Sequence, residues 1–247
     1  MIENYNIYRF SLQEKIRYIL EGLLKAVILG YLFYRSIWGI IFLCPLIFIH
    51  CKKKRSELAK TRKWQLNLEF RDGINSLAAA LSAGYSVEHA FTEAVKDLKR
   101  MYPQGSLIVG EFTFIANQIQ MNITAEKALY NFGRRSGIED IISFAEVFSI
   151  AKRTGGDIVQ IIKTTGNIIN DKLEVRREIM TMIAGKKFEA NIMKFVPAGI
   201  LGFLSVSSPG FLKPLYNNIF GIIIMTVILG IYLCTSRFID KIISIEV

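Results

Sequence analysis

Few residues in this 247-residue chain have the type and spacing that a reaction needs. The stretch Thr154–Asp157 comes nearest to a phosphate-binding loop, but it places a carboxylate where such a loop uses backbone amides and a lysine. We interpret it as a helix stop followed by an N-cap. His50 and His89 cannot form the HExxH pair of a zinc enzyme, and His89 is expected on the surface of a helix's first turn. The sequence therefore predicts no catalytic residue.

Metal and redox chemistry are not predicted either. The three cysteines, Cys44, Cys51 and Cys234, lie in or beside apolar runs without close spacing, which excludes a disulfide framework and a zinc site. Glu21 and Lys25 are spaced like a proton relay, but such a pair at the end of a membrane span is more simply hydrated. We therefore expect no cofactor and no metal.

The composition indicates an integral membrane protein. Hydrophobic residues make up 51% of the chain, mean hydropathy is +0.33, and most of the apolar excess lies in residues 19–51 and 192–236. The net charge of +10 could suggest nucleic acid, but the densest basic run, Lys52–Arg55, directly follows an apolar segment. Basic residues beside a span mark the cytosolic face. We expect contact with membrane lipids and no nucleic-acid binding.

The first apolar region, residues 19–51, allows two interpretations. It could be a hairpin of two short helices, Leu20–Tyr34 and Ile37–Cys51, with Arg35-Ser36 at its outer tip. The alternative is one span over residues 26–50, which buries Arg35 at a cost of at least about 2.5 kcal/mol. Tyr31, Tyr34 and Trp38 favour the hairpin, because such residues prefer headgroup depth. The weakness of the hairpin is that each arm is about 22 Å long, whereas the hydrocarbon core is about 30 Å thick.

The second apolar region predicts two spans, Ile192–Val206 and Ile219–Thr235, joined by a short outer loop that opens at Ser207–Gly210. Residues 1–18 are then a cytosolic lead-in, and residues 237–247 a cytosolic tail. Lys213 is the one basic residue of the outer loop, whereas the middle of the chain is rich in lysine and arginine. This bias places the middle of the chain inside the cell.

The middle segment, residues 52–191, predicts an all-α domain, a compact antiparallel bundle of about six helices. A turn pattern repeats along it, in which a residue able to end a helix precedes a capping side chain. Its three copies contain Gly84 with Ser86, Asn122 with Thr124, and Gly155-Gly156 with Asp157 and Gln160. The expected helices cover residues 66–83, 112–121, 125–134 and 138–152, and another starts at Asp157, while Met101–Gly105 is the expected loop.

The stretch Thr154–Met193 combines a turn, a long cytosolic helix and the start of a membrane span in one piece. Apolar residues recur at helical spacing, and charged residues occupy the other positions. The basic side chains are candidates for contact with a partner or with lipid: Lys172, Arg176, Arg177, Lys186 and Lys187.

Three stretches together resemble the type II secretion F-domain family, most closely its Tad pilus branch. They are LAAALSAGYSVEHAF from Leu77, its echo at residues 122–129, and FAEVFSIAKRTGGDIVQIIKTTGNI from Phe144, followed by a basic helix, Pro197 and two spans. The similarity covers roughly Leu66 to the C-terminus. Against the family's pattern we expect a shorter N-terminus than some relatives carry, and one bundle domain where other branches have two.

The resemblance implies a non-catalytic platform subunit in the bacterial inner membrane. Its implied partners are a pilus-assembly or secretion ATPase, pilins and a second platform subunit or further copies in an oligomer. A small transporter or channel subunit is the alternative, weakened because Lys213 is the one ionisable residue between Lys194 and Arg237.

Overall fold

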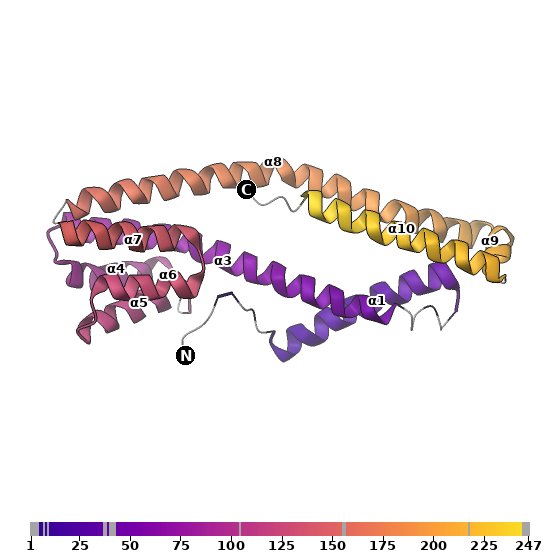
Figure 1. The fold of residues 1–247 in the computed structure, drawn as a ribbon, viewed down its shortest axis with the longest axis horizontal. Helices are drawn as coiled ribbons and strands as arrows, with labels where there is room; N and C mark the ends of the chain where they lie inside the picture. Colours follow the sequence, from indigo (N-terminus) through magenta and orange to yellow (C-terminus); the bar gives the residue numbers. More distant parts are fainter. Residues whose placement is uncertain are drawn as a thin grey trace. The chain divides into compact units, whose positions relative to one another are not determined.

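The computed structural model describes residues 5, 6, 8, 10–36, 39, 43–103, 105–154, 157–216 and 218–243. These residues form helices and no strand, so the all-α prediction is confirmed (Figure 1). In chain order the helices are α1 (Leu12–Tyr34), α3 (Cys44–Ser82), α4 (Val87–Met101), α5 (Leu107–Gln120), α6 (Ala125–Ser136), α7 (Glu139–Thr154), α8 (Ile158–Ser207), α9 (Pro209–Tyr216) and α10 (Ile219–Ile243).

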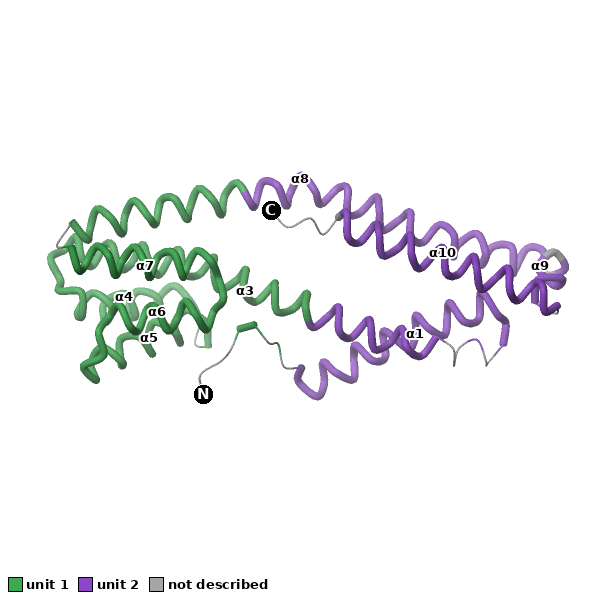
Figure 2. The backbone as a smooth tube through the Cα atoms, in the orientation of Figure 1, with its two compact units in different colours: residues 1–9, 56–175 green, residues 10–55, 176–247 purple. Residues whose placement is uncertain are grey.

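The chain divides into two compact units (Figure 2). Unit 1 consists of residues 1–9 and 56–175, and unit 2 of residues 10–55 and 176–247. The polypeptide therefore passes from one unit to the other three times, after residues 9, 55 and 175.

Unit 1 is built around phenylalanine side chains that come from different helices. Phe70 of α3 is fully buried, and its ring centroid lies 6.4 Å from Phe112, 5.9 Å from Phe132 and 5.4 Å from Phe144. These rings come from α3, α5, α6 and α7, and α4 adds Phe91 against Phe112 at 5.9 Å. Edge-to-face ring pairs and full burial make this cluster a source of stability in unit 1.

Helix α8 packs on the same core because its residues follow helical spacing. Ile162, Gly166, Ile169 and Leu173 are its buried residues, and a Cβ atom on Gly166 would lie 3.1 Å from the side chain of Ile74 in α3. The small residue lets the two helices approach closely. Helices form at the positions predicted for the bundle, but α5 begins at Leu107, earlier than predicted, and residues 66–82 are the last part of the longer helix α3. Helix α4 ends at Met101, before the loop predicted around Pro103.

Unit 2 contains α1, which ends at Tyr34 where Arg35 adopts a left-handed conformation with φ 45°. The described helices therefore do not form one continuous helix over residues 26–50. The helix that follows, α3, begins at Cys44 and continues without a break to Ser82. Trp38 and Ile37, which the sequence placed after the turn, lie outside the described residues.

The end of the chain differs from prediction at two points, the first being that α10 continues to Ile243, into the predicted tail. The segment opening at Ser207–Gly210 was expected to be a loop, but α9 starts at Pro209. Proline suits the first helical position, because its missing N–H would have no partner there and its φ is already helical. Pro197, by contrast, lies inside α8 and does not end it.

Two of the described helices are long and apolar enough to cross a membrane, judged by length and composition: α8 and the Ile219–Ile242 stretch of α10. None of the most apolar 18-residue stretch of α8 is buried inside the protein, and only 17% of the corresponding stretch of α10 is buried. Exposed apolar stretches of this length are typical of membrane spans.

Candidate partner-binding surface

Three helices of unit 1 begin with the same local geometry. At the start of α4, Ser86 Oγ accepts a hydrogen bond from the amide of His89 at 3.3 Å. At the start of α6, Thr124 Oγ1 accepts one from Lys127 at 3.4 Å, and at the start of α8, Asp157 Oδ1 accepts one from Gln160 at 3.0 Å. Each bond satisfies an amide that has no partner within its helix.

Two of these capping residues follow, two positions later, a residue with positive φ. Gly84 has φ 90° and Asn122 has φ 63°, the left-handed region that glycine and asparagine adopt most readily. Gly155 and Gly156, which the sequence assigned to the third turn, lie outside the described residues.

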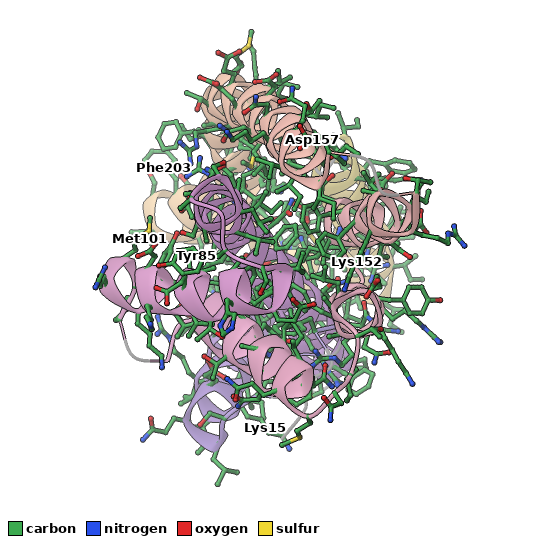
Figure 3. The ribbon with its side chains drawn as sticks, turned by 90° about the vertical axis from the view of Figure 1, so that its left-hand side faces the viewer. Lys15, Tyr85, Met101, Lys152, Asp157 and Phe203 are labelled. Carbon is green, nitrogen blue, oxygen red and sulfur yellow. The ribbon has the colours of Figure 1, made fainter. Side chains whose placement is uncertain are left out.

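One lysine brings the starts of α4 and α6 together. Lys152, near the end of α7, places Nζ 3.4 Å from Glu126 Oε2 and 3.6 Å from Glu88 Oε1. Both carboxylates lie in first turns, where the helix dipole also favours negative charge. A hydrogen bond from its own backbone amide and the charge of Lys152 lower the pKa of Glu88. Figure 3 looks onto this end of unit 1, with Lys152 and Asp157 labelled.

An open groove of about 520 Å³ lies beside this cluster, between α6 and α7. Tyr130 and Ile150 line it and are about half exposed, at 49% and 53%. The other lining residues are Thr124, Glu126, Lys127, Ala145, Glu146 and Ser149. A shallow groove with an apolar centre and charges of both signs suits a protein segment better than a small substrate.

Buried polar contacts hold the helices that form this surface. Glu69 of α3 accepts hydrogen bonds from Ser106 Oγ at 2.8 Å and from the amide of Ile108 at 3.1 Å, so a side chain of α3 caps α5. Asp140 of α7 accepts one from Asn67 Nδ2 at 2.7 Å and pairs with Lys172 Nζ at 2.6 Å. These contacts hold α3, α5, α7 and α8 in fixed positions relative to one another.

The second buried network includes a residue from the N-terminal segment. Arg135 Nη2 lies 2.7 Å from Glu111 Oε2, and the hydroxyl of Tyr5 donates to Glu111 Oε1 at 2.8 Å. Tyr5 is 3% exposed, and its backbone amide donates to the carbonyl of Arg135 at 3.3 Å. Burial, with the adjacent Glu111 carboxylate, raises the pKa of Tyr5 well above its ordinary value, so the phenol stays a donor. Residue 5 is thus part of the packing of unit 1.

The basic candidates of the long helix do not come together. Lys172 is in the contact with Asp140 just described, and Lys186 pairs with Glu189 one turn on, at 3.0 Å. Arg177 and Lys187 are exposed, and Arg176 is half-buried. Of these basic residues, Lys172 is thus paired with a buried carboxylate of unit 1.

Sequence reasoning missed Glu69, Glu111 and Asp140, which are all buried. A signal was present, because these carboxylates occupy positions of the apolar stripes of their helices: Glu69 follows Leu66 by three residues, and Glu111 follows Ile108 by three. A charge on such a stripe indicates a buried partner, but its identity requires the fold. Among the residues that the structure describes, no group of three His, Cys, Asp or Glu could hold a metal ion.

Replacing Asp157 with alanine should destabilise the start of α8 by about 1 kcal/mol, because the amide of Gln160 loses its acceptor. Amide hydrogen exchange in the first turn of α8 should become faster. Asp157→Asn keeps an oxygen at the same place and should exchange like the unmodified protein. Equal exchange in the alanine variant would show that the cap contributes nothing.

Comparison with known families gives one match. Residues 73–206 match the family described as type II secretion system (T2SS), protein F, which is more than half of the chain. The matched range includes the end of α3, the whole of α4 to α7 and nearly all of α8, while α1, α9 and α10 lie outside it. No curated protein and no solved structure matches the chain. The chain therefore belongs to the type II secretion system protein F family.

Proposed function

We propose that this protein is a non-catalytic inner-membrane platform subunit of a Tad-type pilus or a related secretion machine. Members of its family are in general membrane platform proteins that work with an ATPase and with pilins or secretion components. In this proposal unit 1 lies in the cytosol and binds the assembly ATPase, and unit 2 lies in the membrane and contacts pilins. Further copies or a second platform subunit complete the assembly.

The family match over residues 73–206 is the observation that supports this proposal most strongly. The match falls on the helices that carry the capped turns, the Lys152 cluster and the groove between α6 and α7. The apolar surfaces of α8 and α10 support the membrane location. Buried hydrogen bonds and ion pairs hold the helices of unit 1 in fixed positions. The surface of unit 1 is therefore suited to stable contact with a protein.

Helix α8 supports a mechanical role for the chain. It runs from Ile158 to Ser207 as one helix and contains both the buried residues of unit 1 and the apolar stretch suited to lipid. An uninterrupted helix can transmit a displacement along its length, whereas a flexible linker cannot. We propose that ATP-driven movement of the ATPase reaches the pilin through this helix.

Full-length protein in lipid nanodiscs should bind its cognate assembly ATPase in an interferometry experiment, and empty nanodiscs should not. We expect Ile150→Asp to weaken this binding at least about tenfold, because it places a charge in the apolar centre of the groove. Ile168→Asp is the matched control: Ile168 is also exposed, at 61%, but lies on α8 away from the groove.

Two outcomes would contradict the proposal in different ways. If both substitutions weakened ATPase binding equally, or if neither weakened it, the groove would be excluded as the contact. No binding by the unmodified protein, together with solute flux through reconstituted vesicles, would favour the transporter alternative instead.

A further inference from the structure

An ion cluster joins three helices at one end of the apolar part of unit 2. Asp240 of α10 places Oδ2 2.5 Å from Lys53 Nζ of α3, and its Oδ1 pairs with Lys194 Nζ of α8. The hydroxyl of Tyr232, two turns earlier on α10, donates to the carbonyl of Lys194 at 3.0 Å. These contacts place one charged residue of each helix at the same depth. We call Lys53, Lys194 and Asp240 the inner charged layer.

A second set of polar contacts joins α1, α9 and α10 at the opposite end. The guanidinium carbon of Arg35 lies 5.9 Å from the ring centroid of Tyr216, and the hydroxyl of Tyr216 donates to the carbonyl of Leu32 at 2.6 Å. The hydroxyls of Tyr34 and Thr226 are hydrogen-bonded at 3.0 Å. Aromatic residues with polar tips and a nearby cation are typical of headgroup depth. We call Arg35, Tyr216, Tyr34 and Thr226 the outer polar layer.

The helices between these layers are short for an ordinary bilayer. At 1.5 Å per residue, α8 covers about 20 Å from Lys194 to its end at Ser207, and α10 about 21 Å from Thr226 to Asp240. In α1 the last charged residue before Arg35 is Lys25, and the stretch between the two measures about 15 Å. Even the whole apolar stretch of α10, from Ile219 to Arg237, measures about 27 Å, and the hydrocarbon core is about 30 Å thick.

Movement of the charged side chains cannot easily extend these lengths. A lysine usually reaches toward the headgroups along its flexible stem. Lys53 and Lys194, however, both pair with Asp240, whose short side chain stays close to the axis of α10. Arg35 is similarly held against the ring of Tyr216. The bilayer is then the component that must adjust, by thinning around the protein.

We propose that unit 2 presents a lipid-facing belt matched to a bilayer thinner than the ordinary membrane, and that it thins the membrane around it. The inference rests on the proposed membrane location of unit 2. Exposed apolar side chains between the layers, such as Phe203 of α8 and Ile231 of α10, form the lipid-facing surface of this belt. A pilin helix of ordinary length beside the belt cannot keep all its apolar residues in hydrocarbon. Thinning thereby lowers the cost of removing that helix from the membrane.

The test is thermal unfolding of full-length protein in vesicles that differ in acyl-chain length. The lipids are dimyristoleoyl, dipalmitoleoyl, dioleoyl and dieicosenoyl phosphatidylcholine, each mixed with the phosphatidylglycerol of the same chain. We expect the highest unfolding temperature in the shortest chains and a steady decrease as the chains lengthen. A maximum in dioleoyl or longer lipid would overturn the inference. Flotation on a density gradient comes first, because protein that does not float with the vesicles would overturn the proposed membrane location as well.

Lengthening the belt at either layer should move the maximum toward longer chains. The triple variant Lys53→Leu, Lys194→Leu, Asp240→Leu replaces the inner charged layer by apolar residues of similar volume, a change that often preserves folding. Arg35→Leu tests the outer polar layer independently if the triple variant does not fold. The control is Glu93→Leu with Lys96→Leu, an exposed ion pair of unit 1 at 2.6 Å. An unchanged maximum in the lengthened variants, or the same change in the control, would overturn the inference.

Discussion

Phe70→Ala should lower the free energy of unfolding of unit 1 by about 4 kcal/mol, within the range for removing a buried aromatic side chain. Phe70 is fully buried and contacts aromatic rings of three other helices, so the cavity cannot close without moving all of them. The measurement is urea unfolding of full-length protein in detergent, followed by the fluorescence of Trp64. Trp64 packs against the same core, and a Trp38→Phe background removes the other tryptophan.

Ile168→Ala is the control for Phe70→Ala, because Ile168 is 61% exposed and its truncation leaves no cavity. Its effect should remain within about 0.5 kcal/mol. Phe70→Leu should fall between the two, since leucine fills part of the space. A loss of less than about 1 kcal/mol for Phe70→Ala would mean that the aromatic cluster does not hold unit 1 together.

Arg135→Met should destabilise unit 1 by about 3 kcal/mol, because Glu111 would remain buried without its cation. The side chain of Glu111 is only 8% exposed, so water cannot replace the guanidinium. The stem of methionine retains much of the apolar contact of Arg135 with Phe114, whose ring centroid lies 5.0 Å from the guanidinium carbon. The loss in free energy of unfolding therefore measures mainly the removal of the positive charge of Arg135. Urea unfolding of full-length protein measures it.

The double variant Glu111→Gln, Arg135→Met separates charge from packing. Removing both charges should recover at least half of the stability lost in Arg135→Met, because a neutral amide is far less costly to bury than a lone carboxylate. The two changes are therefore expected to be strongly non-additive. Additive losses would show that Glu111 and Arg135 act independently.

The turns of unit 1 could be predicted because their signals are local. Gly84 before Ser86, and Asn122 before Thr124, each combine a residue that accepts positive φ with one that caps the next helix. The helical stripes were equally clear, since Leu66, Phe70 and Ile74 recur at four-residue steps and are all fully buried. Local rules thus locate most helices of the bundle.

The networks could not be predicted because their partners are distant in sequence. Tyr5 and Glu111 are separated by 106 residues, and Lys53 and Asp240 by 187. Periodicity shows that a position is buried but not which side chain lies opposite. The helix α9 escaped prediction for a different reason, because the Pro-Gly pair at its start is also typical of a loop.

The burial of Tyr5 determines how this protein can be divided for experiment. A truncated version made from residues 52–191 would lack the phenol that donates to Glu111 and the ring that lies 5.0 Å from the guanidinium of Arg62. Its vacant site would expose the carboxylate of Glu111 to solvent. A soluble version of unit 1 should therefore carry the first nine residues, joined by a linker ahead of Ser56, or receive them as a separate synthetic peptide.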